Sequence, residues 1–246
     1  MSAGFQCKQF YIAHDRCAMK VGTDGLLLGA WAPLSKNNVV TTSGNILDIG
    51  AGSGLISVML AQRSQGLLPI TAIELDSAAA EQAKENISVS PWPNSIRLLT
   101  ADILAYQPTE RYRLIVSNPP FFQQSMPAAQ LSRHLARHTD SLPFNRLLEK
   151  AATMLKPEGV LALILPYTGI EQFITLAQSL GWQLQQHCVV FSKLNKPQRS
   201  LISFVYGISD KPLQNSQLLI HNPDGSYTAQ YQQLLGDFYL KFPSSL

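Results

Sequence analysis

Two short motifs, each directly after an apolar strand pattern, contain the residues best suited to chemistry. The first is Asp48-Ile49-Gly50-Ala51-Gly52-Ser53-Gly54, and the second is Asn118-Pro119-Pro120-Phe121. Closely spaced glycines let the backbone turn sharply and approach a ligand, so the first motif predicts a nucleotide-like cofactor. The second motif offers an amide oxygen, a backbone carbonyl and a flat apolar face to one planar amine. Together the two motifs indicate a methyl transfer to nitrogen.

The glycine motif departs from the dinucleotide fingerprint, which would need a glycine where Leu55 stands. The position of Asp48 is also informative. A carboxylate is poorly placed beside an anionic pyrophosphate, whereas a cationic sulfonium ligand with an ammonium group would be stabilised by it. The motif therefore predicts S-adenosylmethionine as the cofactor and disfavours an NAD-dependent enzyme.

Two further acids follow the next two predicted strands. Glu74 stands 26 residues after Asp48, at a strand end from which an acid can accept both ribose hydroxyls. Asp102 is placed to receive the exocyclic amine of the cofactor's adenine, with Ile103 against the ring. Each acid alone is better explained as a helix cap or surface carboxylate, but three at successive strand ends favour a cofactor site. The cofactor-binding residues predicted in this way are Asp48, Gly50, Gly52, Gly54, Glu74, Leu75, Asp102, Ile103 and Asn118.

The Asn-Pro-Pro-Phe tetrapeptide is the predicted catalytic group. An aromatic amine is a poor nucleophile because its lone pair is delocalised, and hydrogen bonds to the Asn118 side-chain oxygen and the Pro119 carbonyl would favour a tetrahedral nitrogen. Pro119 and Pro120 would hold the turn rigid. Phe121 would stack on the base, a contact that contributes about 1–3 kcal/mol. The alternative is a stiff loop without chemistry, but the position at a strand end near the cofactor motif favours catalysis.

The elements that would position these residues alternate between strand and helix patterns. The strand candidates are residues 45–49, 70–75, 96–100, 114–117, 160–165, 183–192 and 200–208. This alternation is typical of βαβ units and a parallel sheet. The last two are joined by about seven residues, too few for a parallel crossover, so they should be antiparallel. We therefore expect an α/β fold: a Rossmann-like class I methyltransferase sheet, mainly parallel and seven-stranded, with a C-terminal antiparallel hairpin and helices on both faces.

Four segments have helical patterns, namely 55–62, 77–86, 143–155 and 170–180. For the last, Thr168 and Glu171 form the pattern of a capping box, and Gly181 is a C-terminal stop signal. The 246 residues are expected to form a single domain, 1–246, with an extension over 1–44, a catalytic core over 45–208 and a tail over 214–246. The tail includes an amphipathic stretch over 227–235.

Composition narrows the class of protein. Three cysteines without Cys-x-x-Cys spacing suggest neither a disulfide framework nor a zinc site, so no metal is expected. The first residues do not resemble a signal peptide, and the longest apolar run, 160–165, is too short to cross a bilayer. A cytoplasmic protein is expected.

The net charge of +3 permits an anionic partner without requiring one. Basic residues outnumber acidic ones by five to two in 123–156 and by four to one in 187–213. Such clusters are often solvated surface. Within the two clusters, the residues predicted to contact RNA phosphates, on charge alone, are Arg133, Arg137, Lys193 and Lys196.

The N-terminal sequence adds a resemblance. Several parts of the chain resemble the bacterial valine-tRNA adenine-N6 methyltransferase family. They are the N-terminal runs 8–10, 13–25 and 27–33, together with 47–55, the Glu74 region, Ala101-Asp102, 118–121 and Gly181-Trp182. That family lies within the Asn-Pro-Pro-Tyr/Phe class of adenosylmethionine-dependent methyltransferases. The resemblance covers nearly the whole chain.

This resemblance implies N6-methylation of the adenosine 3′ of the anticodon, with the tRNA anticodon loop as the partner of a monomeric enzyme. Thr23 and Asp24 match an N-terminal motif that lies over the cofactor, which adds Thr23 to the cofactor-binding residues. One departure is Phe121, where tyrosine is usual in the family. The alternatives are guanine-N2 methylation of ribosomal RNA, glutamine-N5 methylation of protein, and an RNA-binding module without catalysis.

Overall fold

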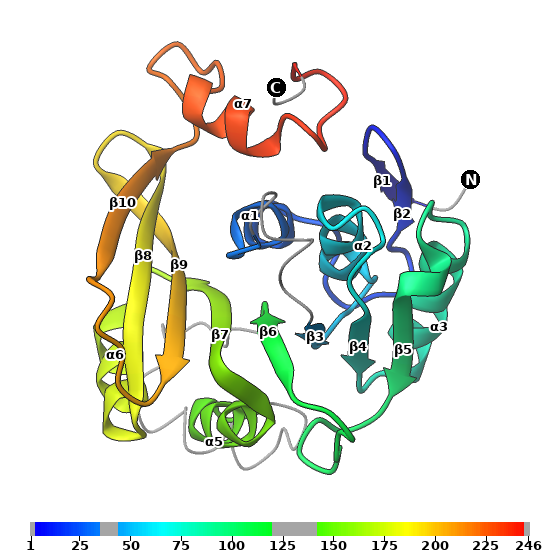
Figure 1. Ribbon diagram of the computed structural model, residues 1–246. Helices are drawn as coiled ribbons and strands as arrows, with labels where there is room; N and C mark the ends of the chain where they lie inside the picture. Colours follow the sequence, from blue (N-terminus) through cyan, green and yellow to red (C-terminus); the bar gives the residue numbers. More distant parts are fainter. Residues whose placement is uncertain (1–2, 35–43, 120–141, 244–246) are drawn as a thin grey trace, which may run out of the picture.

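The computed structural model describes residues 3–34, 44–119 and 142–243. Eight strands of this part of the chain form one twisted sheet at the centre of the molecule (Figure 1). Their order across the sheet is β10 (Gln214–Leu219), β8 (Trp182–Lys193), β9 (Lys196–Tyr206), β7 (Leu155–Pro166), β6 (Tyr112–Ser117), β3 (Asn45–Ile49), β4 (Ile70–Glu74) and β5 (Ile96–Thr100).

The strand pairing confirms the expected sheet. Strands β5, β4, β3, β6 and β7 are parallel, whereas β9 is antiparallel to both β7 and β8. The structure has the seven expected strands and adds β10, which pairs parallel with β8 at the edge of the sheet. The sequence of β10 is mostly polar because most of its residues are exposed, so it lacks the apolar pattern of a strand.

The direction in which the strand order grows reverses between β3 and β6. The chain passes from β3 outward to β4 and β5, and then returns to β6 on the other side of β3. Ligands of open α/β sheets bind at such a switch point, beyond the carboxyl ends of the strands. The Ser117 hydroxyl donates a hydrogen bond to the Ile49 carbonyl at 2.8 Å, which ties the ends of the two strands together.

Helices cover both faces of the sheet, as expected. Helices α1 (Thr23–Trp31) and α2 (Leu55–Arg63) pack on one face, with Ile87 of α3 (Ser77–Ser88) in the same apolar cluster. Helices α5 (Phe144–Met154) and α6 (Ile170–Ser179) pack on the other. Successive residues of β3 alternate, since Ile46 belongs to the first cluster and Leu47 to the second.

The N-terminal extension adds a short hairpin, β1 (Gly4–Gln6) and β2 (Tyr11–Ala13), before α1. Helix α1 lies very close to α2, because a Cβ added to Gly29 would meet Met59 at 2.6 Å and one added to Gly25 would meet Leu55 at 2.9 Å. A short 3-10 turn, η2 (Pro93–Ser95), precedes β5. The amphipathic stretch of the tail forms α7 (Ala229–Leu235), whose N-cap is Thr228.

The capping-box prediction for α6 is wrong. The N-cap residue is Gly169, in a left-handed conformation with φ of 87°, and no side chain caps the helix. A box starting at Thr168 would need an extended residue immediately before the helix, and the chain instead turns through Gly169. The predicted stop at Gly181 is confirmed, since this glycine follows the helix with φ of 86°.

All three cysteines are free and buried. In the described ranges, no helix combines the length and apolar character needed to cross a membrane. The same ranges contain no group of three or more His, Cys, Asp or Glu side chains arranged to hold a metal ion.

Candidate active site

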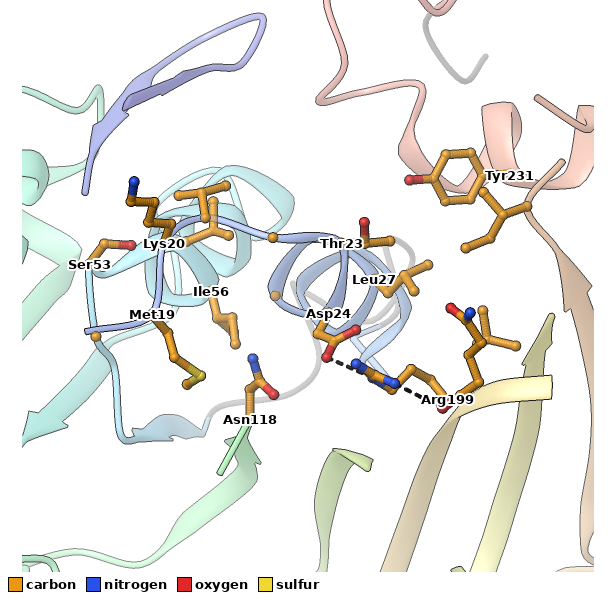
Figure 2. A pocket seen from close by; sticks show the side chains of 18 of the residues that line it. Met19, Lys20, Thr23, Asp24, Leu27, Ser53, Ile56, Asn118, Arg199 and Tyr231 are labelled. Atoms are coloured by element: carbon orange, nitrogen blue, oxygen red, sulfur yellow. Dashed lines mark hydrogen bonds and ion pairs between the residues drawn. The ribbon is translucent and has the colours of Figure 1, made fainter. Parts of the chain in front are cut away.

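A cavity of about 570 Å³ lies at the carboxyl edge of the sheet, where the strand order reverses. Its turn side is formed by residues 19–25 and 50–53 together with Asn118. Its aromatic side is formed by Ser192, Gln198, Arg199, His221, Tyr227, Tyr231 and Tyr239. Figure 2 shows the first turn of α1, with Thr23 and Asp24, between the two sides.

The glycine turn gives the cavity an open floor. Gly50, Gly52 and Gly54 have φ angles of 73°, 54° and 80°, a region in which other residues are strained. A Cβ added to Gly50 or Gly52 would have no atom within 4 Å, so both glycines border open space. Gly54 begins α2 and faces Ala83 instead. Two of the three predicted glycines therefore line the cavity.

Asn118 points into the same cavity from the end of β6 (Figure 2). Its side-chain oxygen is buried and has no hydrogen-bond partner among the described residues. A buried amide oxygen without a partner is costly unless a ligand supplies the donor. Pro119, the next residue in the chain, is buried. The other two predicted catalytic residues, Pro120 and Phe121, lie outside the described residues.

Glu74 holds the glycine turn in place. One carboxylate oxygen accepts a hydrogen bond from the Gly52 backbone N–H at 2.7 Å, and the other accepts one from the Asp76 N–H at 2.9 Å. Leu75, which follows it, is 56% exposed. Neither residue lines the cavity, but Glu74 contacts a residue that does.

Asp48 lies beneath the turn and is fully buried. One of its oxygens accepts a hydrogen bond from the Ser57 hydroxyl at 2.7 Å, and the other has no partner among the described residues. Burial raises the pKa of Asp48 to about 7, and the Ser57 hydrogen bond offsets part of that effect. The structure therefore places this acid below the cavity and not in its lining.

Asp102 and Ile103 also lie outside the lining of the cavity. Asp102 is exposed and accepts a hydrogen bond from the Leu104 N–H at 2.8 Å. Ile103 is 7% exposed and packs in the apolar cluster that contains Ile49 and Ile73. Of the ten predicted cofactor-binding residues, the cavity brings together Thr23, Gly50, Gly52 and Asn118.

Two buried amides of α3 hold the segment that covers the turn, and sequence reasoning missed both. Asn86 pairs with the backbone of Ala13, accepting from its N–H at 2.9 Å and donating to its carbonyl at 2.8 Å, and it also donates to the Ser53 carbonyl. The Gln82 oxygen accepts from the Arg16 N–H at 3.0 Å. The only signal in the sequence is their spacing of four residues on one helix face.

An ion pair joins α1 to the second half of the sheet. The Arg199 guanidinium donates to a carboxylate oxygen of Asp24 at 2.8 Å, as Figure 2 shows. The Thr23-Asp24 motif and the basic cluster 187–213 thus meet at one cavity, through two residues that are 175 positions apart in the sequence. The sequence alone did not pair them.

The four basic candidates for RNA contact divide into two groups. Lys193 and Lys196 are exposed at the tip of the β8–β9 hairpin, next to Ser192 and Gln198 of the cavity wall. Arg133 and Arg137 lie outside the described residues.

Comparison with known proteins shows the family to which the chain belongs. Residues 29–187 match the family model of the methyltransferase small domain. The chain is 44% identical to the tRNA1(Val) (adenine(37)-N6)-methyltransferase of Dickeya chrysanthemi, over 97% of this chain and 95% of that protein. It is 46% identical to the protein of the same name from Pectobacterium carotovorum, over 96% and 94%. The chain belongs to this family of methyltransferases.

Family membership agrees with the fold. A solved structure of a predicted O-methyltransferase from Agrobacterium tumefaciens superposes with a TM-score of 0.67 at 19% identity, covering 87% of this chain and 96% of the other. At this identity the likeness concerns the fold alone. The class I methyltransferase sheet expected from the sequence is therefore confirmed.

Proposed function

We propose that this chain transfers a methyl group from S-adenosylmethionine to the N6 nitrogen of an adenine in tRNA, the adenosine 3′ of the anticodon in valine tRNA. The observation that supports this best is the buried oxygen of Asn118, which has no hydrogen-bond partner among the described residues and lies in the cavity that the glycine turn also lines. The names of the relatives specify adenine 37 of a valine tRNA.

The residues of the turn side fit the proposed cofactor. When bound, S-adenosylmethionine supplies an electrophilic methyl group on a positively charged sulfur. The open space beside Gly50 and Gly52 allows close approach of a ligand to the backbone, and Glu74 presents a carboxylate at the neighbouring strand end. Thr23 would cover the ligand from α1. Roles for Asp48, Gly54, Leu75, Asp102 and Ile103 remain predictions.

The tetrapeptide would prepare the nitrogen for attack. The Asn118 oxygen and the Pro119 carbonyl would each accept a hydrogen bond from the exocyclic amine, which favours a tetrahedral nitrogen with a lone pair available for bonding. The hydrogen bond from Ser117 to Ile49 sets the position of Asn118 relative to Gly50. Holding two reacting groups in this way lowers the entropic cost of the reaction.

The finer points of the proposal concern the context of the reaction. The enzyme would act as a monomer in the cytoplasm, with its 246 residues in one domain and the anticodon loop as the part of the tRNA that it binds. Phe121 would stack on the adenine. Size-exclusion chromatography coupled to light scattering measures the oligomeric state directly.

The test is a methylation assay with labelled cofactor and unmodified tRNA, followed by identification of the labelled nucleoside by mass. We expect N6-methyladenosine in a transcript of valine tRNA and no label in a matched transcript with guanosine at the target position. Label in N2-methylguanosine would support the alternative of guanine-N2 methylation. Label in a protein glutamine would support the alternative of glutamine-N5 methylation. Absence of any transfer would contradict the proposal.

A substitution separates catalysis from binding. Asn118→Ala should abolish methyl transfer and leave cofactor affinity within about twofold of the unsubstituted enzyme, because the proposed hydrogen bonds strengthen only in the transition state. Isothermal calorimetry with the cofactor and a single-turnover assay measure the two effects. An equal loss of both would place Asn118 among the residues that only bind the cofactor.

A further inference from the structure

Three rings of the C-terminal tail form a stack on the aromatic side of the cavity. His221 and Tyr227 lie with ring centres 4.9 Å apart and planes inclined by 29°, and Tyr227 and Tyr231 lie 5.1 Å apart with planes inclined by 21°. The stack extends from the core to the surface, because Tyr231 is 1% exposed and Tyr227 is 38% exposed. Tyr227 is the middle ring, with His221 and Tyr231 on its two faces, so the stack ends at the outer face of His221 and exposes the edge of Tyr227.

Hydrogen bonds hold the stack in place. The hydroxyls of Tyr231 and Tyr239 are 3.3 Å apart, and a ring nitrogen of His221 lies 3.1 Å from the Ser192 carbonyl. The Thr228 hydroxyl accepts from the Tyr231 N–H at the start of α7. Rings whose orientation is already set lose little conformational freedom on binding, so the arrangement is suited to a flat ligand.

The surroundings of the stack are polar and basic. Ser192 and Gln198 line the same side of the cavity, and Lys193 and Lys196 lie between them at the hairpin tip. Exposed aromatic faces next to lysines are the features with which proteins bind unpaired nucleotides, the rings stacking on bases and the cations contacting phosphates. Packing of the tail accounts for the ring of Tyr227, which also meets Tyr239 and Phe242 edge-on, but it does not require two lysines at the adjacent hairpin tip.

The stack is separate from the proposed position of the target base. The Asp24–Arg199 ion pair and the first turn of α1 lie between Asn118 and Tyr231, as Figure 2 shows. The cavity is nevertheless continuous across this division. An RNA with one base at Asn118 would place a second base at the aromatic side of the same cavity.

We propose that the aromatic side of the cavity binds a second unpaired base of the RNA substrate, distinct from the base that is methylated. This proposal rests on the proposed function, because it assumes an RNA substrate whose target base lies at Asn118. The base would stack on the outer face of His221, which Tyr227 supports from behind, and Lys193 and Lys196 would contact the adjoining phosphates. The site would then contribute to specificity for one tRNA, because the tetrapeptide would contact only the base that is methylated.

The test uses valine tRNA anticodon stem-loops in which each loop nucleotide in turn is replaced by 2-aminopurine, whose fluorescence falls when it stacks. We expect one position besides the target to be quenched by the full-length enzyme. Tyr227→Leu should abolish that quenching and weaken binding of the stem-loop by about tenfold, and Tyr227→Phe should restore both. The matched control is Tyr206→Leu, another exposed tyrosine at the opposite end of β9.

Three outcomes would overturn the proposal. The first is unchanged quenching and affinity in Tyr227→Leu when the thermal melt is unchanged. The second is a loss of S-adenosylmethionine affinity in the same variant, which would assign the aromatic side to the cofactor. The third is quenching at the target position alone. Failure of the proposed function is distinguished by the unsubstituted enzyme, which would then methylate no adenosine whether or not the stack binds a base.

Discussion

Two acids at neighbouring strand ends have opposite environments. Glu74 is partly exposed, and its two oxygens accept hydrogen bonds from the Gly52 and Asp76 N–H groups. Asp48 is fully buried and accepts a hydrogen bond from the Ser57 hydroxyl. The sequence marked both residues as cofactor ligands. The structure places neither carboxylate in the lining of the cavity: Glu74 contacts the lining through the Gly52 N–H, and Asp48 lies below the turn.

Replacement of Glu74 tests the first of these environments. Glu74→Ala should weaken cofactor binding by about 1.5–3 kcal/mol, the range for hydrogen bonds to a charged group. Isothermal calorimetry measures the change, and Glu81→Ala on the exposed face of α3 is the matched control. If the variant melted at a lower temperature but bound cofactor normally, Glu74 would be a support for the turn and not a ligand.

Replacement of Asp48 tests the effect of its buried environment. Because burial raises the pKa of Asp48 to about 7, the native state retains a proton that the unfolded state has already lost, so this group destabilises the protein as pH rises from about 4 through 7. Asp48→Asn keeps an acceptor for the Ser57 hydroxyl and removes the charge. We expect its Tm without cofactor to exceed that of the unsubstituted protein at pH 8 by at least about 2 °C.

The pH dependence is the decisive measurement for Asp48. The difference in Tm between Asp48→Asn and the unsubstituted protein should grow from pH 5 to pH 8 and should be small at pH 4. A difference that stayed constant, or that changed sign, would show that the carboxyl is ionised throughout this range in the folded protein. Calorimetry on the same variant reports whether the stability gain is accompanied by weaker cofactor binding.

At the scale of elements, the site depends on a segment that has little regular structure of its own. Residues 14–22 join β2 to α1 and contribute to the cavity wall from Met19 onward. The segment is held at one end by Asn86 and Gln82 of α3, and at the other by the close packing of α1 against α2 at Gly25 and Gly29. Asn86 also contacts the glycine turn through the Ser53 carbonyl. One buried side chain thus couples the covering segment to the floor of the cavity.

Asn86→Ala should loosen this coupling. The variant leaves the Ala13 backbone groups and the Ser53 carbonyl without their partner, which costs about 1–3 kcal/mol for each buried group left unpaired. We expect faster hydrogen exchange in residues 13–22 and a cofactor affinity lowered by about tenfold or more. Lys84→Ala, at an exposed position of the same helix, is the control. Unchanged exchange in 13–22 would show that α1 alone positions the segment.

For the whole molecule, the basic residues near the cavity bear on how tRNA would be bound. The net charge is only +3, so a large tRNA-binding surface cannot be inferred from the total. Lys193 and Lys196 lie at the carboxyl edge of the sheet, the edge that contains the glycine turn and Asn118. These two lysines place positive charge beside the cavity, although the net charge of the whole protein is small.

The double variant Lys193→Ala, Lys196→Ala should lower the slope of log affinity for tRNA against log salt by about 1 to 2, because each lost phosphate contact removes about 0.7–0.9. A filter-binding titration between low and moderate salt gives the slope. The matched control is Arg111→Ala, Arg113→Ala, two exposed residues at the opposite, amino end of β6. Equal slopes in all three proteins would remove the hairpin lysines from the RNA contact.

Local signals in the sequence determined seven strands of the central sheet, most of the helices, the glycine turn and the place of Asn118. They did so because apolar periodicity, positive φ angles at glycine and the carboxyl ends of parallel strands are properties of short segments. The seven expected strands and the antiparallel hairpin followed from these signals. The capping box failed because the chain enters α6 through a left-handed Gly169, which a pattern of side-chain types does not reveal.

Only the tertiary structure decided which residues share the cavity. Asp24 pairs with Arg199 across 175 residues of sequence, and Asn86 binds the backbone of Ala13 across 73. The aromatic rings of the tail line the same cavity as the glycine turn, although they belong to separate elements. Burial of Asp48 likewise depends on the elements packed around it. Contacts of this kind arise from the packing of whole elements, and no short stretch of sequence contains both partners.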